Sequence, residues 1–161
     1  YQGKMVLKSD ANAMHDGKVI DGPITEVNKQ YVYQLVIDNT AENNQVLDYR
    51  VPVVGDEIPF VYLKFRSRET RFSNINSSAK MVEVKTVLSL DEQEKITWFC
   101  KLLKVDYAEL DVLRDNDSKL IYIVDVNPTP WGPPNHLEKH KVKESKQKLF
   151  AAFLNQFFNR Q

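Results

Sequence analysis

The sequence AELDVLRDNDSKLIYIVDVN, residues 108–127, says more about the fold of this chain than any other stretch. Its two ends, Ala108–Arg114 and Leu120–Asn127, have the length of strands and are rich in β-branched and aromatic residues. The polar residues between them, Asp115 to Ser118, are typical of a hairpin connection. The stretch therefore predicts an antiparallel hairpin of two strands.

One face of this hairpin carries acidic and amide side chains. Side chains two residues apart share a face of a strand, so Glu109 lies with Asp111, and Asp125 lies with Asn127. The turn places Asp111 roughly opposite Ile123 and so diagonal to Asp125, about 7–8 Å away. That spacing suits a shared Mg²⁺ ion, which takes one or two carboxylates and completes its octahedron with phosphate and water. By spacing alone, the carboxylates could equally be an ordinary solvated face of the sheet. The opposite face is predicted to join the core through Leu110, Val112, Tyr122, Val124 and Val126.

Other short apolar runs of strand length precede the hairpin and are separated by turn-rich segments. They are Met5–Leu7, Tyr31–Ile37, Arg50–Val54, Ile58–Phe65 and Lys80–Val87. A helix is predicted after Ser89, which forms a capping box with Glu92 and is followed by apolar residues at helical spacing. A closing helix is predicted from about Lys139 to Phe158. This order of elements defines an α+β fold with an antiparallel sheet and flanking helices.

Composition excludes several classes of protein. The 161 residues include 22 Lys and Arg against 22 Asp and Glu, so no global positive field is available for nucleic acid. No apolar run approaches the roughly 20 residues of a membrane span. The single cysteine, Cys100, excludes an intrachain disulfide framework. It favours a reducing, cytoplasmic compartment.

The end of the hairpin, Asp125-Val126-Asn127 followed by Pro128, with Asp111 at a distance of 14 residues upstream, resembles the metal-binding end of ATP-grasp enzymes. The resemblance implies that Asp111, Asp125 and Asn127 hold one or two Mg²⁺ ions on the phosphates of ATP. The family more often has Glu where this chain has Asp125, and the shorter side chain favours contact through a single oxygen.

The N-terminal region resembles the nucleotide-covering part of the same family. Val6-Leu7-Lys8 is similar to the strand that ends in a phosphate-binding lysine, and the following loop, which includes His15, has one glycine where several are common. Residues 33–38 are similar to the hinge strand that reads adenine and ribose. The nucleotide ligands that this implies are Lys8, Gln34, Val36 and Asp38, with Gln34 standing where Glu is usual.

Basic residues continue the resemblance along the middle of the chain. Arg50 resembles the family's arginine that faces substrate or phosphate, and strand periodicity puts Lys64 and Arg66 on one face. The segment from Arg71 through Asn76 resembles a basic-then-asparagine segment near the γ-phosphate and the acceptor. Arg50 and Arg71 are thus the expected catalytic residues, and Lys64 and Arg66 are expected to bind the nucleotide.

The resemblance implies one ATP-grasp-like unit that lacks the family's separate N-terminal domain. Residues 1–40 are expected to supply the lysine strand, loop and hinge, residues 46–134 the sheet with the metal site, and residues 139–161 the last helix. The implied function is an ATP- and Mg²⁺-dependent ligase that joins a small-molecule carboxylate to an amine through an acylphosphate. Two alternatives stay open: an ATP-grasp kinase for small molecules, and a nucleotide-binding or interaction module without turnover. The missing domain or a second copy of the chain is the expected protein partner.

Overall fold

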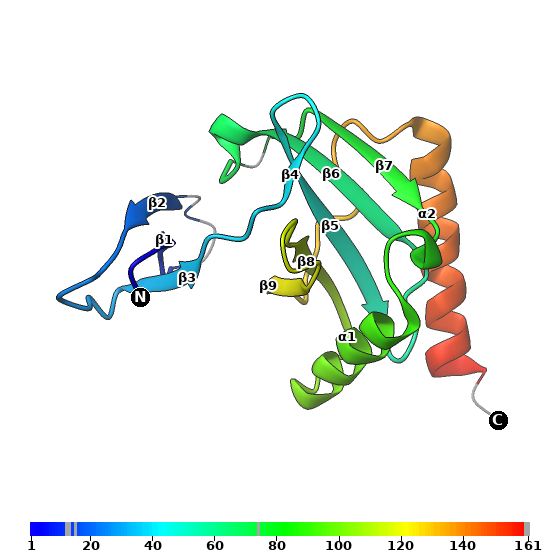
Figure 1. Ribbon diagram of the computed structural model, residues 1–161. Coiled ribbons are helices and arrows are strands. Elements are labelled where there is room, and N and C mark those ends of the chain that lie inside the picture. Colours follow the sequence, from blue (N-terminus) through cyan, green and yellow to red (C-terminus); the bar gives the residue numbers. More distant parts are fainter. Residues whose placement is uncertain (12–13, 15, 74, 160–161) are drawn as a thin grey trace.

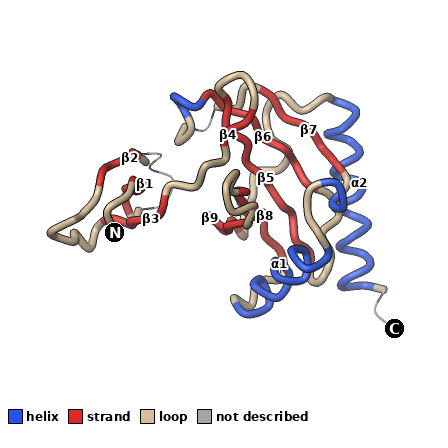
Figure 2. The backbone as a smooth tube through the Cα atoms, in the orientation of Figure 1, coloured by secondary structure: helices blue, strands red, loops and turns tan. Residues whose placement is uncertain are grey.

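The computed structural model describes residues 1–11, 14, 16–73 and 75–159. His15 and Asn74 lie outside the described residues. The strands form two separate antiparallel sheets, and the longer helices accompany the larger one (Figures 1 and 2). The α+β class with antiparallel sheets and flanking helices is confirmed.

The smaller sheet is formed by the N-terminal residues and has the strand order β2-β1-β3. Its strands are β1 (Lys4–Ser9), β2 (Lys18–Asp21) and β3 (Tyr31–Leu35). Within these strands only Met5 and Val6 are buried. Figure 1 shows this sheet standing apart from the main body, to which an extended connector of residues 36–39 joins it.

The larger sheet has the order β7-β6-β5-β8-β9, and the short β4 pairs with β5 outside that path. Its strands are β4 (Thr40–Ala41), β5 (Gln45–Val54), β6 (Val61–Ser67), β7 (Ser78–Val82), β8 (Tyr107–Arg114) and β9 (Ile121–Asn127). The long β5 lies at the centre, between β6 and β8. Short 3₁₀ turns at Arg68–Thr70 and Val84–Thr86 follow β6 and β7.

Helix α1 (Leu90–Leu102) covers one face of the larger sheet. The predicted capping box is present: Ser89 Oγ accepts from the Glu92 amide, and a Glu92 carboxylate oxygen accepts from the Ser89 amide at 2.8 Å. The helix buries Ile96 and Cys100 against alternate residues of the central strands. The core on this face consists of Tyr49, Val51, Val53, Val61, Leu88, Ile96, Cys100, Ala108, Leu110 and Val112.

Helix α2 (Lys139–Phe153), continued by a π-helical turn over Leu154–Phe158, covers part of the opposite face. There Phe60, Tyr62, Ala79 and Leu137 form a second buried cluster, with Val142 and Leu149 of the helix packed on it. The strand residues of this cluster alternate along the chain with strand residues of the first core. Tyr62, for example, directly follows Val61 and points to the opposite face of the sheet. The predicted C-terminal helix is present, and it docks on its own sheet.

The β8–β9 hairpin forms as predicted, but its register differs from the prediction. Asp111 lies directly opposite Asp125, and a β-bulge then shifts the pairing so that Val112 faces Ile123. A bulge adds one residue to one strand and reverses the alternation beyond it. Ile121 and Ile123 therefore pack on the core, and the prediction that Tyr122 and Val124 do so is wrong.

Other boundaries differ because polar turns interrupt apolar runs. The run Lys80–Val87 contains the end of β7 and a 3₁₀ turn rather than a single strand. The strand predicted over Tyr31–Ile37 ends at Leu35, where the connector begins. Strands β2 and β4 were not predicted, since short strands carry little periodicity. No helix among the described residues is long and apolar enough to cross a membrane.

Candidate functional site

The larger sheet has a charged region on the face that α2 only partly covers. Alternate residues of four adjacent strands point to it, which places carboxylates and cations in neighbouring rows. These residues are Asp48 and Arg50 of β5, Lys64 and Arg66 of β6, Glu109 and Asp111 of β8, and Asp125 and Asn127 of β9. We call them the charged face.

Asp111 is the centre of the charged face. Its Oδ1 accepts from Lys64 Nζ at 2.8 Å and from Arg50 Nε at 3.1 Å, and its Oδ2 accepts from Arg50 NH2 at 3.4 Å. Burial alone would raise the pKa of this carboxyl, but Lys64 and Arg50 outweigh it and hold the pKa below its ordinary value. Asp111 is therefore an ionised carboxylate shared by two cations.

Glu109 lies beside this group and is the most deeply buried acid of the face, with 3 % of its side chain exposed. Its Oε2 lies 3.8 Å from Arg50 Nε and makes no hydrogen bond. Burial, assisted by the negative charge of Asp111, raises the pKa of Glu109 to about 7, against the opposing influence of Arg50 and Lys64. One buried oxygen is thus left without a donor in the middle of the site.

The β8–β9 pairing puts oxygen ligands in two successive rows. Glu109 lies opposite Asn127, and Asp111 lies opposite Asp125. These groups, together with the unpartnered oxygen of Glu109, are the hard oxygen donors that Mg²⁺ prefers. They fit a magnesium ion by their chemistry and register. Among the described residues, however, no three acidic, histidine or cysteine side chains already converge as a metal site, and Asp111 is bonded to cations.

Arg66 extends the charged face toward the edge of the sheet. Its guanidinium pairs with Asp48 and donates from NH1 to the Ser73 carbonyl oxygen at 2.9 Å, while its Nε is buried without a partner. Asp48 also accepts from Asn39 Nδ2 at 2.9 Å. Asp48 and the Ser73 carbonyl therefore hold the Arg66 guanidinium in place, while its Nε donor is unused.

Arg71 contacts the connector rather than the centre of the charged face. Its NH2 donates to the Ile37 carbonyl oxygen at 3.1 Å and to Asn39 Oδ1 at 2.9 Å. The connector is also bound by the β8–β9 turn, because the Asn116 amide donates to the Asp38 carbonyl oxygen at 2.7 Å. These contacts set where the smaller sheet leaves the larger one.

The remaining predicted nucleotide ligands lie on the smaller sheet and the connector. Lys8 pairs in register with Val32, and Gln34 pairs with Val6, within the smaller sheet. The Asp38 carboxylate is exposed and accepts from the Thr40 amide at 3.0 Å. Hydrogen bonding to the Thr40 side chain and then to this amide lowers the pKa of Asp38. The structure therefore brings together Arg50, Lys64, Arg66, Asp111, Asp125 and Asn127 but holds Lys8, Gln34, Val36 and Asp38 on another part of the chain.

Sequence reasoning gave no role to three buried polar residues of this region. Strand periodicity already placed Glu109 on the same face as Asp111, and it could have placed Asp48 with Arg50. Asn39, which is 4 % exposed, carries no such signal because it lies in the connector.

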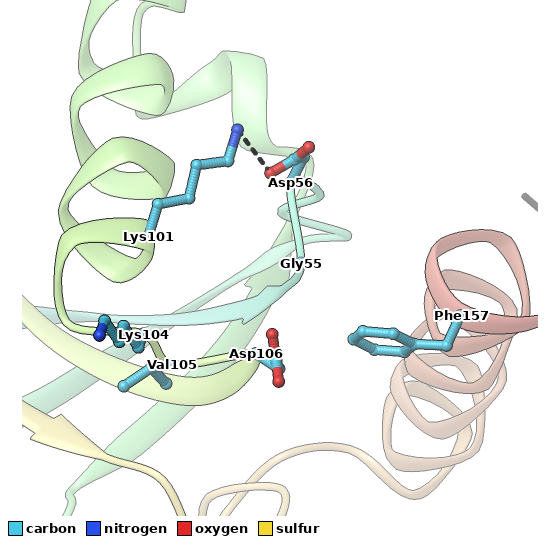
Figure 3. A pocket seen from close by; sticks show the side chains of 7 residues that line it. All are labelled: Gly55, Asp56, Lys101, Lys104, Val105, Asp106 and Phe157. Carbon is cyan, nitrogen blue, oxygen red and sulfur yellow. Dashed lines mark ion pairs between the residues drawn. The ribbon is translucent and has the colours of Figure 1, made fainter.

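A pocket away from the charged face lies at the far end of β5 from Asp48. It has a volume of about 430 Å³ and lies between the end of α1, the turn after β5 and Phe157. Lys101 and Asp56, both at its rim, form an ion pair of 2.8 Å (Figure 3). None of the predicted site residues lines this cavity.

Known structures share the fold of this chain. One of them, described as ATP-grasp ligase PsnB complexed with minimal precursor, Mg and ADP, matches with a TM-score of 0.63 and 14 % identity over 94 % of this chain and 47 % of that chain. PsnB complexed with precursor peptide PsnA2 and AMPPNP matches with a TM-score of 0.59 and 12 % identity over 94 % of this chain and 46 % of that one. The present chain thus spans about half the length of these structures. No curated protein sequence matches it.

These likenesses show that the two sheets and their helices form an ATP-grasp fold. The RimK-like ATP-grasp domain family matches residues 2–147, and the chain belongs to that family.

Proposed function

We propose that this chain is the nucleotide- and metal-binding part of an ATP-dependent ligase, which activates a carboxylate as an acylphosphate and joins it to an amine. The observation that carries the proposal is the charged face, where Arg50, Lys64 and Arg66 lie on the same face of one sheet as Asp111, Asp125 and Asn127. Family membership and the likeness to structures described as ATP-grasp ligases support it.

The proposed reaction has two steps. An oxygen of the substrate carboxylate attacks the γ-phosphorus of ATP, the bond between that phosphorus and the bridging oxygen to the β-phosphate breaks, and ADP leaves. The amine nitrogen then attacks the acyl carbon, phosphate leaves, and the nitrogen loses a proton to solvent. No side-chain nucleophile is needed, because positioning and charge stabilisation lower the barrier.

The basic residues of this chain would stabilise the negative charge. Arg50 and Arg71 are the proposed catalytic groups, since a guanidinium presents a fixed fork of donors to phosphate oxygens. Lys64 and Arg66 are proposed to bind the nucleotide phosphates, and the unused Nε of Arg66 supports this role. Lys8 is proposed to reach the phosphates from the smaller sheet.

The adenosine is proposed to bind along the end of β3 and the connector, where Gln34, Val36 and Asp38 lie. Asp111, Asp125 and Asn127 would hold Mg²⁺, which when bound neutralises charge on the phosphates. The unpartnered oxygen of Glu109 supports a cation at this place.

Small molecules and peptides are both candidate substrates of the proposed reaction. The PsnB structures are described with precursor peptides, so a peptide carboxylate or amine joins the small molecules expected from the sequence as a candidate. A cytoplasmic location is proposed from the single cysteine, Cys100, which is buried and not in a disulfide.

Calorimetric titration with ATP, with and without Mg²⁺, tests the proposal. Wild-type protein is expected to bind ATP in a Mg²⁺-dependent manner, and Asp125→Ala is expected to lose that dependence while keeping its fold, because Asp125 is exposed. Asp117→Ala makes the same change of charge in the turn of the same hairpin and should bind like wild type. Binding that is absent, or unaffected by Asp125→Ala, would contradict the proposal.

Product analysis separates the ligase from its alternatives. ADP together with an amide supports the ligase, and ADP with a phosphorylated hydroxyl supports the kinase. Binding without ADP release from any tested carboxylate and amine supports a module without turnover.

A further inference from the structure

Lys64 is placed unusually for a residue expected to bind phosphate. It lies on β6, whereas its hydrogen-bond acceptor, Asp111, lies on β8, with β5 between them. Neighbouring strands are about 4.8 Å apart, so the Lys64 and Asp111 side chains together span about 10 Å of the sheet across β5. The exposed fraction of the Lys64 side chain is 3 %. A long lysine is thus extended beneath the surface toward one acid.

Asp111, the acid that Lys64 reaches, is one of the three residues that are proposed to hold Mg²⁺. Oδ1 of Asp111 accepts from both Lys64 and Arg50, and Oδ2 faces Arg50. A divalent cation that approached this carboxylate would meet the positive charges of Lys64, which is buried, and of Arg50, which is half-buried, and burial weakens the screening of both. In the absence of ligand, Lys64 and Arg50 therefore already balance the negative charge of Asp111.

The two cations are not held equally. The guanidinium of Arg50 contacts both oxygens of Asp111 and lies 3.8 Å from Glu109, whereas the ammonium of Lys64 meets a single oxygen of Asp111. An ammonium on a flexible stem redirects its donors more readily than a planar fork does. Lys64 is thus the cation more easily drawn to a new acceptor.

Resting on the proposed function, we propose that Lys64 is a built-in counter-ion that blocks Asp111 from divalent cations until a polyphosphate takes up its ammonium. The exchange links the two ligands: phosphate gains Lys64, and Asp111 becomes available to Mg²⁺. Linkage is reciprocal, so the metal also favours phosphate binding by the same factor. The protein then binds a divalent cation poorly without a nucleotide and binds the pair cooperatively.

Nucleotide-free binding of Mn²⁺, followed by electron paramagnetic resonance, tests the proposal on the whole 161-residue chain. Lys64→Met is expected to bind Mn²⁺ about tenfold more tightly than wild type, within the usual range of coupling between sites. Lys64→Gln, which is neutral but keeps a donor, should show a gain in the same direction. Lys80→Met removes the same charge from an exposed position on β7 and should bind like wild type.

A second substitution tests whether the gain in Mn²⁺ affinity depends on Asp111. Asp111→Asn in the Lys64→Met background should remove the gain, because the released carboxylate is the proposed ligand. Equal Mn²⁺ affinity in folded wild-type and Lys64→Met protein, or a gain that survives Asp111→Asn, would overturn the proposal. Circular dichroism of each variant confirms that folded proteins are compared.

Metal-free ATP binding in EDTA distinguishes this role from a structural one. Lys64→Met should weaken ATP binding while it strengthens Mn²⁺ binding, whereas loss of a merely structural lysine would not move the two affinities in opposite directions. If wild type binds Mg²⁺ and ATP together but Lys64→Met gains no Mn²⁺ affinity, this inference fails alone. If the Mn²⁺ gain appears but no form of the protein binds ATP, the proposed function fails and the blocked cation site stands.

Discussion

The two sheets of this protein differ in how they are stabilised. Strand β5 of the larger sheet is buried along most of its length, between α1 on one face and α2 with the charged face on the other. The smaller sheet buries only Met5 and Val6 within its strands and exposes large apolar residues, among them Leu35 at 51 %. Apolar burial is the main favourable term in folding, so the larger sheet carries most of the stability.

The connector explains how the less stable sheet is kept in place. Its backbone and side chains are bonded by Arg71 from one side and by Asn116 from the β8–β9 turn on the other. A region with few buried contacts opens with a lower free energy than a core does. We therefore expect the smaller sheet to exchange its amide protons sooner than the larger sheet.

The largest effect is expected from the core of the larger sheet. Leu110→Ala removes a side chain that is fully buried under α1, and such a change costs about 2–5 kcal/mol of unfolding free energy. Denaturant unfolding measures it, with Leu120→Ala, which is 59 % exposed, as the control. A cost for Leu110→Ala as small as that of the control would show that the larger sheet is not the stable unit.

A smaller and more local effect is expected at the connector. Asn39→Ala removes the donor to Leu47 and Asp48 and the acceptor of Arg71, which leaves buried polar groups unpaired at a cost of about 1–3 kcal/mol. Hydrogen exchange should increase most in the connector and the smaller sheet. Asn135→Ala, at an exposed position, should leave the exchange pattern unchanged. A uniform increase over both sheets would contradict the assignment of Asn39 to the connector.

A pH-dependent effect is expected where α1 meets β8. Arg114 hydrogen-bonds Glu92 at 2.7 Å, and this bond is the main cause that lowers the pKa of Glu92 below 4.5. A lowered folded-state pKa stabilises the protein above the unfolded pKa, and this stabilisation is lost as the pH falls through the folded value. Glu92→Gln should cost about 1 kcal/mol at pH 7. Its difference from wild type, measured by thermal unfolding, should shrink below pH of about 4.5. If the difference in stability between Glu92→Gln and wild type did not change with pH, the ion pair between Glu92 and Arg114 would be refuted.

The smallest effect is expected on the smaller sheet itself. Lys4 and Asp21 form a 2.8 Å ion pair, but their side chains are 66 % and 80 % exposed. Exposed pairs contribute less than about 1 kcal/mol, so Lys4→Met should change unfolding of the chain little. High salt should not measurably alter the difference in unfolding free energy between wild type and Lys4→Met. A larger cost would mean that this pair, rather than the connector, holds the smaller sheet together.

Much of the larger sheet could be predicted from periodicity, because its strands are long enough to alternate clearly. Helix α1 was predicted from its capping box, and the acidic face of the hairpin from the two-residue spacing of Asp125 and Asn127. The exact pairing of Asp111 could not be predicted, because a bulge is set by how strands fit together and leaves no local signal. The catalytic and binding roles of the chosen residues stay predictions.

By itself the sequence determined the α+β class, the two faces of the long strands and the resemblance to ATP-grasp enzymes, since these depend on the order and spacing of residues along the chain. Only the tertiary structure decided that Lys64 crosses β5 to Asp111 and that Arg71 binds the connector. It also decided that Oε2 of Glu109 is buried without a hydrogen-bond donor. The reason is that pairing between strands far apart in sequence, together with burial, determines which charges meet and how strongly they interact.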